Sequence, residues 1–368
     1  MRAAVTFDLG DAGAWGLMLD SGRAAITKSP PRDPDLYLRT SPTVMQEILL
    51  GRRPGYEAFL AGELEARGNI ALGLELESLF DPPTERDPSY PVTIHPKIGR
   101  VRWSVLAAGP PEGLPVLLIH GLASSKMSFL PTVKGLSGTY RVYAVDLPGF
   151  GDSAKPMAPY DAPWFADRVL ELLDELELKQ AGLVGNSMGG RISLEVAARE
   201  PDRVKAMVLL CPALGIPWFR QAVPFVRLAR AEFAALPLAP SRGRVMRTLR
   251  SIFAHPERVS QSWMETAADE FFRVYSKPRG RMAFYAAARQ IYLDEPHAEE
   301  GLWARLAEVD VPAHFVFGRR DNLVPASFAK VVAEMMPNAK LSVFEDCGHV
   351  PQVEEPDRTN RLIRALMG

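Results

Sequence analysis

A serine flanked by glycines is the first candidate for chemistry in this sequence. The segment Gly185-Asn186-Ser187-Met188-Gly189-Gly190 lies between an apolar run, 182–185, and an amphipathic run, 188–200. A serine on a tight turn from strand to helix exposes its hydroxyl, and the glycines let such a turn close without a Cβ clash. The pattern predicts that Ser187 is a nucleophile.

An acid and a base follow in the order that such a serine needs. Asp321 comes after the apolar segment His314–Phe317, and His349 comes after Leu341–Glu345. Both residues would lie just beyond the carboxyl ends of parallel strands, where open α/β sheets place their sites. We expect His349 to act as general base and then as general acid. Asp321 would fix the imidazole tautomer.

Three other acids lie close to His349 in the sequence, namely Asp346, Glu354 and Glu355. Asp346 is too near the histidine backbone to reach its ring. The two glutamates are expected to cap the last helix. Asp321 therefore remains the predicted partner of His349.

A serine hydrolase also needs donors for the developing oxyanion. The backbone N–H of Met188, directly after the nucleophile, is the first predicted donor. The second is expected from the loop at 120–125, where the N–H of Leu122 is favoured and Ala123 comes next. His120 itself is expected to bond the loop backbone rather than to catalyse.

Strand and helix patterns alternate from about residue 92 to 212 and again from 314 to 367. Continuous apolar strands between amphipathic helices predict an α/β fold with a mostly parallel sheet and helices on both faces. The expected strands are Val101–Ala108, Val116–His120, Val142–Asp146, Gly182–Gly185, Ala206–Cys211, His314–Phe317 and Leu341–Glu345.

The stretch from about 216 to 302 interrupts this rhythm, because it is strand-poor and rich in aromatic residues and arginine. We expect a helical cap insertion that roofs an apolar pocket. The arginines would form either a solvated helix face or a surface that contacts anionic lipid or an acidic partner. They are Arg227, Arg230, Arg242, Arg244, Arg247, Arg250, Arg273, Arg279 and Arg281.

The N-terminal residues form a different pattern. Short strand-like runs and three helix-like runs predict a small α+β domain at 1–80, with Ser41 as the N-cap of a helix at Pro42–Leu50. Residues 81–91 are rich in proline and charge, so we expect a linker there and a second domain at 92–368.

Composition excludes several classes. The net charge of −1 gives no bulk attraction to nucleic acid. The two cysteines do not suggest a disulfide framework, no signal-like or membrane-spanning run is evident, and a cytoplasmic location is expected. Neither zinc-type spacing nor a P-loop occurs, so no metal or cofactor is expected.

Residues from about 92 to 368 resemble the α/β-hydrolase superfamily, near its esterase, meta-cleavage-product hydrolase and haloperoxidase members. The motifs that match are His120-Gly121, Asp146–Ser153, Gly185–Gly190, Asp321 and Gly348-His349. Serine at 187 disfavours dehalogenases and epoxide hydrolases, which use aspartate there. Carbon–carbon bond hydrolases often carry tryptophan after the histidine, where this chain has Val350.

The N-terminal pattern resembles the later part of a sterol carrier protein type 2 domain. The likeness rests on the helix 43–51, the turn 61–64 and Gly68-Asn69. The usual first helix and initial strand of that domain do not precede Met1. A dimer partner, the hydrolase surface or nothing at all would take their place.

The leading hypothesis is a serine hydrolase that cleaves a carboxylic ester of a hydrophobic, lipid-like substrate through an acyl-enzyme. A carbon–carbon bond hydrolase or a perhydrolase would use the same triad, since one fold hosts many reactions. A lipid-binding or sensing protein with a slow or vestigial triad is the third hypothesis. The sequence leaves the oligomeric state open.

Overall fold

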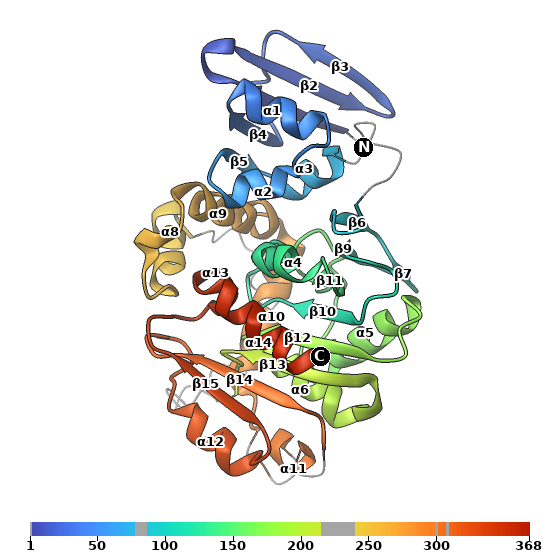
Figure 1. Cartoon of the computed structure of the whole chain (residues 1–368), viewed down its shortest axis with the longest axis vertical. Coiled ribbons are helices and arrows are strands. Elements are labelled where there is room, and N and C mark those ends of the chain that lie inside the picture. Colours follow the sequence, from blue (N-terminus) through green and yellow to red (C-terminus); the bar gives the residue numbers. More distant parts are fainter. Residues whose placement is uncertain (1, 78–86, 215–239, 297, 299–300, 307–308) are drawn as a thin grey trace.

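The computed structural model describes residues 2–77, 87–214, 240–296, 298, 301–306 and 309–368. Residues 92–344 contribute the strands of a large sheet, and a smaller N-terminal sheet lies above it in the view of Figure 1. Within the described ranges, none of the helices combines the length and apolarity that a membrane span requires.

The large sheet has the strand order β15-β14-β13-β12-β10-β11-β9-β6. Every neighbouring pair from β15 to β11 is parallel, whereas β9 and β6 add an antiparallel edge. The predicted mostly parallel α/β fold is thereby confirmed. The strands are β6 (Val92–Ile94), β9 (Ser104–Ala108), β10 (Pro115–Ile119), β11 (Arg141–Asp146), β12 (Ala181–Asn186), β13 (Val204–Leu210), β14 (Ala313–Gly318) and β15 (Lys340–Phe344).

Helices cover both faces of this sheet. Leu117 and Ile119 of β10 belong to the apolar cluster on the face of the sheet that α5 (Ala162–Glu175) and α6 (Met188–Arg199) cover. Their neighbours Val116 and Leu118 pack with α4 (Leu130–Leu136) and α14 (Pro356–Met367) on the other side. Successive side chains of a strand point to opposite faces, so a continuous apolar run is what a sheet buried on both faces requires.

The expected strand at Val101–Ala108 was wrong as a single element. The chain instead forms a two-stranded hairpin of β7 (Lys97–Ile98) and β8 (Val101–Arg102), and only β9 joins the large sheet. Trp103 divides the two strands because its side chain is fully buried and its N–H donates to the carbonyl of Pro96 at 2.8 Å.

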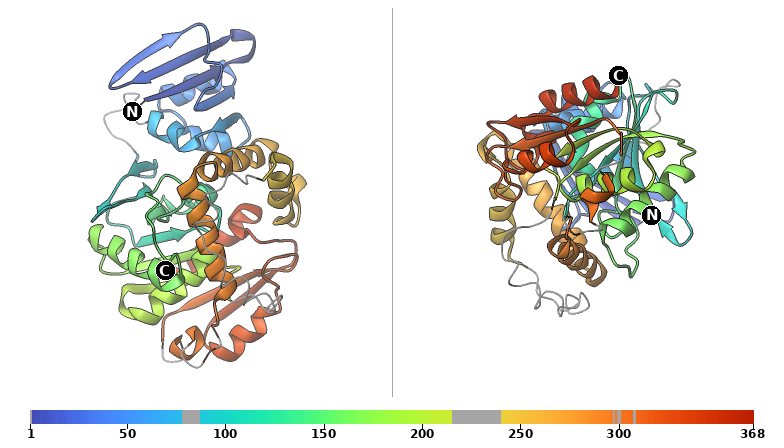
Figure 2. Two further views of the ribbon diagram at one scale, coloured as in Figure 1. Left: turned by 180° about the vertical axis from the view of Figure 1, so that it is seen from behind. Right: turned by 90° about the horizontal axis from the view of Figure 1, so that it is seen from below.

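The described residues of the expected cap region form helices joined by short loops, with no strand among them. Its helices are α8 (Arg242–Ser251), α9 (Gln261–Tyr275), α10 (Pro278–Leu293) and α11 (Leu302–Leu306). The hydroxyls of Ser241 and Ser260 cap α8 and α9 by accepting from backbone N–H groups. From behind, α10 runs down along the large sheet, and α9 lies between this sheet and the N-terminal part (Figure 2). Residues 215–239 of the expected cap lie outside the described residues.

The carboxyl-terminal part completes the large domain. The helix α12 (Phe328–Met335) lies between β14 and β15 in the chain, and α13 (Pro351–Glu354) precedes α14. Val332 of α12 is fully buried in the cluster that also holds α5 and α6.

The N-terminal sheet has the order β3-β2-β1-β4-β5, in which β1 and β4 are parallel and the other pairs antiparallel. Its elements are β1 (Arg2–Asp8), β2 (Ala14–Asp20), β3 (Arg23–Thr27), β4 (Leu36–Thr40), α1 (Pro42–Leu49), α2 (Gly55–Leu60), β5 (Leu64–Gly68) and α3 (Ile70–Glu77). Ser41 caps α1 by accepting from Val44 N–H, as predicted.

The two sheets are joined by packing as well as by the chain. Tyr56, Phe59 and Leu74 belong to the same apolar cluster as Leu130 and Val133 of α4. Most of the predicted linker at 81–91 falls in residues 78–86, outside the described residues, so the domain boundaries stay predictions.

Candidate active site

Ser187 lies on the sharp turn that the sequence predicts. It follows β12 and precedes α6, with φ 54° and ψ −116°, a conformation that residues with a side chain rarely adopt. Its N–H donates to Leu210 at 2.9 Å, and its carbonyl accepts from Ala213 at 3.0 Å. The turn therefore holds a partly exposed serine side chain at the start of a helix.

The glycines around Ser187 are required by close backbone approach. A Cβ on Gly189 would lie 2.0 Å from the carbonyl oxygen of Ile119, and one on Gly185 would lie 2.4 Å from that of Gly189. A Cβ on Gly121 would meet the Ser187 Cβ at 3.1 Å. The loop after β10 thus passes directly beside the candidate nucleophile.

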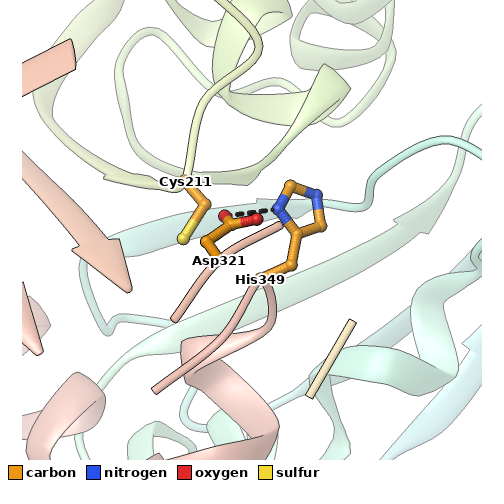
Figure 3. A group of neighbouring side chains, drawn as sticks. All are labelled: Cys211, Asp321 and His349. Carbon is orange, nitrogen blue, oxygen red and sulfur yellow. Dashed lines mark hydrogen bonds and ion pairs between the residues drawn. The ribbon is translucent and has the colours of Figure 1, made fainter. Parts of the chain in front are cut away.

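His349 and Asp321 are brought together by the structure, and their catalytic roles stay a prediction. Nδ1 of His349 lies 2.7 Å from Oδ2 of Asp321, and both side chains are buried (Figure 3). Oδ1 of Asp321 accepts the N–H groups of Leu323 and Val324 at 2.7 and 2.9 Å. With its proton on Nδ1 toward the carboxylate, the imidazole has Nε2 free to act as a base.

Backbone bonds fix the position of His349. Its N–H donates to Ile252, after α8, at 2.7 Å. Its carbonyl accepts from Nδ2 of Asn186 at 3.0 Å, and the same amide nitrogen donates to Leu210 at 3.0 Å. Asn186 therefore ties the histidine loop to the strand beside the serine, a role that its place in the glycine–serine motif did not reveal.

The expected capping role of the two glutamates was wrong. Glu354 accepts from the N–H groups of Gly348 and Ala254, at 2.8 and 2.7 Å, and Glu355 makes no side-chain cap on α14. Glu354 instead joins the histidine loop to the end of the α8 segment. Asp346 pairs with Arg320 at 3.2 Å, in agreement with its rejection as the triad acid.

Cys211 lies beside the acid–base pair (Figure 3). Its sulfur, a carboxylate oxygen of Asp321 and a ring nitrogen of His349 lie within 4.8 Å of one another. Burial raises the pKa of the Cys211 thiol well above its usual range, whereas a metal needs the thiolate. The Asp321 oxygens already accept three N–H groups, so the donor chemistry does not fit a metal ion.

The two predicted oxyanion donors directly follow Ser187 and Gly121, which are in close approach, and their role stays a prediction. Met188 is the first residue of α6, where N–H groups have no partner within the helix. Leu122 follows Gly121, and no acceptor within the described part of the chain takes its N–H. Ala123, the second choice, has a φ of 61°.

His120 holds the loop backbone, as expected. Its Nδ1 lies 2.7 Å from the carbonyl oxygen of Gly121, and its Nε2 lies 3.1 Å from the N–H of Leu147. Burial lowers the pKa of His120, and because its Nε2 accepts the N–H of Leu147 that nitrogen carries no proton. Nε2 accepts and Nδ1 donates, which fixes the path of the loop toward Leu122.

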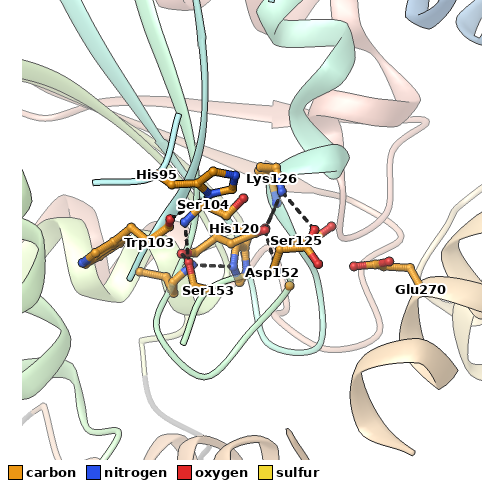
Figure 4. Close-up of polar contacts among 12 residues, drawn as sticks. His95, Trp103, Ser104, His120, Ser125, Lys126, Asp152, Ser153 and Glu270 are labelled. Carbon is orange, nitrogen blue, oxygen red and sulfur yellow. Dashed lines mark hydrogen bonds and ion pairs between the residues drawn. The ribbon is translucent and has the colours of Figure 1, made fainter. Parts of the chain in front are cut away.

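A buried lysine anchors the end of the same loop (Figure 4). Nζ of Lys126 lies 2.6 Å from Asp146 and 3.5 Å from Asp152, and its backbone N–H donates to Asp146 at 2.8 Å. Burial alone would lower the pKa of Lys126, but the two carboxylates outweigh burial and raise it. Nothing in the local sequence pattern distinguishes Lys126 from an exposed lysine, so the sequence alone did not predict this network.

The network continues into the cap helix α9. Arg273 donates to Asp152 at 2.6 Å and to Glu270 at 2.7 Å. Burial raises the pKa of Glu270, while the pKa of Asp152 is lowered because Lys126 and Arg273 outweigh its burial. The loop at 120–126 and the cap are therefore linked through buried and partly buried charges.

The cap arginines do not form one surface. Arg273 is turned inward, and Arg281 is buried with its guanidinium on the carbonyl of Ser276. Arg242 pairs with Asp269 at 2.6 Å. Exposed arginines remain on α8, and Arg227 and Arg230 lie outside the described residues.

Comparison with known proteins finds a separate family match for each of the two parts of the chain. Residues 115–356 match the family model of the alpha/beta hydrolase fold, and residues 2–81 match that of the SCP-2 sterol transfer family. The resemblances drawn from the sequence motifs are thereby confirmed.

Several relatives match the larger part of the chain. A 2-hydroxymuconate semialdehyde hydrolase of Pseudomonas putida is 32% identical over 286 residues, which cover 74% of this chain and 95% of the relative. A monoacylglycerol lipase of Mus musculus is 27% identical over 67% of this chain and 74% of its own length. The crystal structure of a membrane phospholipase A, a bacterial virulence factor, has a TM-score of 0.65 and 25% identity, covering 81% of this chain and 91% of that one.

Proposed function

Because the chain belongs to the α/β-hydrolase fold family, we propose that it hydrolyses carboxylic esters of hydrophobic, lipid-like molecules through an acyl-enzyme on Ser187. The observation that carries this proposal is the buried 2.7 Å bond between His349 and Asp321 in a site whose serine lies on a strained turn. A serine in this setting can transfer its proton to the imidazole as it attacks.

The proposed reaction uses side chains and backbone groups alone. Oγ of Ser187 attacks the ester carbonyl carbon while Nε2 of His349 takes the hydroxyl proton. The N–H groups of Met188 and Leu122 stabilise the oxyanion, and each such donor contributes about 3 kcal/mol in comparable sites. The carbon–oxygen bond then breaks, and the leaving alcohol takes the proton from His349.

Deacylation repeats the same steps with water. His349 takes a proton from water as the hydroxide oxygen attacks the acyl carbon, and then returns a proton to Oγ of Ser187. Asp321 stabilises the imidazolium in both halves and keeps Nε2 directed at the serine. The products are a carboxylic acid and an alcohol.

The preference for a lipid-like ester rests on likeness. A membrane phospholipase A and a monoacylglycerol lipase are among the similar proteins, and the N-terminal residues match a sterol transfer family. Peripheral contact with anionic lipid remains a proposal for the exposed arginines of α8. Liposome flotation that shows no dependence on anionic lipid or salt would exclude it.

Carbon–carbon bond hydrolysis is the second candidate, because the relative with 32% identity is a 2-hydroxymuconate semialdehyde hydrolase. The triad could serve either reaction. Val350 follows the histidine here, where carbon–carbon bond hydrolases often carry tryptophan.

Labelling and turnover together test the proposal. A fluorophosphonate probe should modify Ser187, as located by mass spectrometry of the digested protein. Ser187→Ala should lose labelling and reduce ester hydrolysis by at least about a thousandfold. Ser251→Ala, which removes an exposed hydroxyl on α8, is the control and should keep both.

A panel of p-nitrophenyl esters of increasing chain length, run beside 2-hydroxymuconate semialdehyde, separates the two candidates. Faster turnover of medium or long esters supports the proposed function. Turnover of the semialdehyde without that of any ester would replace it by the second candidate. A folded protein that neither reacts nor turns over any of these compounds would contradict both.

A further inference from the structure

The loop at 120–126, which holds the second predicted oxyanion donor, is fastened at both ends to the end of β11. At its start, Nε2 of His120 accepts the N–H of Leu147, the residue after that strand. At its end, the backbone N–H and the ammonium of Lys126 both donate to the carboxylate of Asp146, at 2.8 and 2.6 Å. The course of the loop between these anchors therefore depends on how firmly Lys126 is held.

Two carboxylates hold the buried ammonium of Lys126, whose side chain is 1% exposed. A buried charge is stable only where such partners replace its hydration. Asp146 is fully buried, and the backbone of Gly151 packs so closely on it that a Cβ there would lie 2.2 Å from its carboxyl carbon. Asp152, 3.5 Å from the ammonium and 21% exposed, is the less constrained of the two partners.

Arg273 of the cap helix α9 holds Asp152 in place. Its Nη1 donates to Asp152 at 2.6 Å, while Nε and Nη2 donate to the two oxygens of Glu270, both at 2.7 Å. Figure 4 shows the carboxylate of Glu270 on the side of α9 that faces Asp152. Burial alone would lower the pKa of Arg273, but the two carboxylates outweigh burial and raise it. Three bonds therefore fix the charged guanidinium in one orientation.

The helix that carries Arg273 is itself held by the N-terminal sheet. Arg67 of β5 pairs with Glu265 and Asp269 of α9. The hydroxyl of Thr266 donates to a backbone carbonyl of the same strand. Arg273 therefore projects from a helix whose place is fixed by contacts away from the candidate active site.

We propose that Arg273 is a positioning residue for ester hydrolysis at Ser187. Its bond to Asp152 fixes the carboxylate that holds Lys126, and Lys126 in turn fixes the loop. The N–H of Leu122 is thereby directed at the oxyanion that forms during attack. This inference rests on the proposed function and adds a part of the cap to its machinery.

An oxyanion donor acts on the transition state, so a misplaced donor lowers kcat more than it changes KM. Arg273→Met, which removes the charge, should lower kcat on a p-nitrophenyl ester by about tenfold, less than the hundredfold or more that complete loss of a donor costs. KM should stay within about twofold. Arg273→Lys, which keeps the charge, should recover part of kcat. A change in KM alone, or equal losses of kcat in both variants, would overturn the positioning role.

Arg203→Met is the matched control. The side chain of Arg203 is 23% exposed, against 22% for Arg273, and pairs with Asp174 at 2.7 Å. Its Nε donates to the carbonyl of Lys179, before the start of β12, whereas Ser187 follows the end of that strand. The control should keep kcat and KM within about twofold of the wild type. An equal loss of kcat in the control would mean that the effect is not specific to Arg273.

A double-mutant cycle tests the route through Asp152. Asp152→Asn should lower kcat by a factor similar to that of Arg273→Met. The double variant should lose little more than either single variant, because both changes break the same contact. Losses of kcat that multiply would exclude this route. If Arg273→Met does not fold, as judged by circular dichroism, Arg273→Gln takes its place in the cycle.

Hydrogen exchange followed by mass spectrometry separates this inference from the proposed function. The backbone N–H of Lys126 is bound to Asp146 and should exchange slowly in the wild type. Peptides that span 120–129 should exchange several-fold faster in folded Arg273→Met and at the wild-type rate in Arg203→Met. Unchanged exchange in folded Arg273→Met would overturn the anchoring of the loop. Faster exchange in a protein that turns over no ester would contradict the proposed function but confirm the anchoring.

Discussion

At the scale of single residues, one buried carboxylate organises the helix behind the candidate nucleophile. Glu195 of α6 is fully buried and accepts from Arg191 at 2.8 Å, Arg199 at 3.1 Å and Arg305 at 2.7 Å. Arg305 belongs to α11, at the end of the cap region. Arg191 also donates to Asp294, after α10, at 2.7 Å. Glu195 therefore joins the helix that begins after Ser187 to the returning end of the cap.

This arrangement predicts a dependence of stability on acid. Burial alone would raise the pKa of Glu195, but the hydrogen bonds from the arginines hold it at about 2, against an ordinary value of 4.5. Because this pKa is lowered, the ionised Glu195 contributes fully to the free energy of unfolding above pH 4.5. That contribution is lost as the pH falls toward 2. The free energy by which wild type exceeds Glu195→Gln should shrink by about 2 kcal/mol between pH 7 and pH 3.

Urea unfolding at several pH values measures that difference. Glu200→Gln, at an exposed residue just beyond the same helix, is the control and should track the wild type. A difference between wild type and Glu195→Gln that stays constant over this pH range would contradict the assignment of the charge to Glu195.

At the scale of elements, the turn between β12 and α6 depends on backbone contact. Gly189 lies where a Cβ would come within 2.0 Å of the Ile119 carbonyl oxygen, which is backbone and cannot move without shifting β10. The glycine–serine motif has a glycine at this position, and the close approach of β10 explains why no side chain fits there.

Gly189→Ala should therefore destabilise the protein strongly, by about 3 kcal/mol or more, and should reduce Ser187 labelling in the fraction that folds. Gly243→Ala is the control, since a Cβ on this helical glycine of α8 would meet nothing within 4 Å. The control should keep or gain stability, by up to about 1 kcal/mol. Equal thermal unfolding of the two variants would refute the steric argument.

A second pair of elements joins the domains. Arg67 of β5 pairs with Glu265 and with Asp269 of α9, the latter at 2.7 Å. The hydroxyl of Thr266 donates to the carbonyl of Ala66 beside them. An edge strand of the N-terminal sheet is thus covered by a cap helix, which satisfies polar groups that would otherwise be exposed.

Arg67→Met should reduce the free energy of unfolding by about 1–2 kcal/mol, because two partly buried carboxylates each lose one of their partners. Arg39→Met on the neighbouring strand should change it by less than about 0.5 kcal/mol, since Arg39 is 60% exposed and lies 3.8 Å from Asp8. Chemical denaturation of both variants at low and moderate salt gives the comparison. Equal losses of unfolding free energy in the two variants would mean that the contact of Arg67 with α9 stabilises the protein no more than the exposed Arg39 does.

At the scale of the whole molecule, one apolar cluster crosses the domain boundary. It joins Phe59 and Leu64 of the N-terminal part to Leu106, Leu118 and Leu130 of the large domain. A shared core makes separate unfolding of the smaller part costly, because apolar surface of both parts would be exposed.

Calorimetry should therefore show a single unfolding transition. Phe59→Ala should move the whole transition to lower temperature, with a loss of about 3 kcal/mol or more. Ile26→Ala, at a residue that is 77% exposed, should not move it. Two transitions, with only the smaller one shifted by Phe59→Ala, would show that the domains unfold independently.

Local patterns predicted much of the fold and the acid–base pair. The alternation of apolar strands and amphipathic helices indicates a parallel sheet because buried strands need apolar residues on both faces. The place of Asp321 and His349 after successive strands brings them to one edge, and the structure joins them at 2.7 Å. The prediction of a single strand over 101–108 was wrong, because the pattern of apolar residues does not reveal that the buried Trp103 separates two strands.

Only the tertiary structure decided how distant parts meet. Arg67 and Asp269 lie 202 positions apart, and Glu195 receives an arginine 110 positions away. Nothing in the residues around Lys126 shows that its charge is buried against Asp146. Local sequence determines which elements form, through the periodicity of apolar residues. The partners of buried charges depend on contacts that exist only after those elements pack.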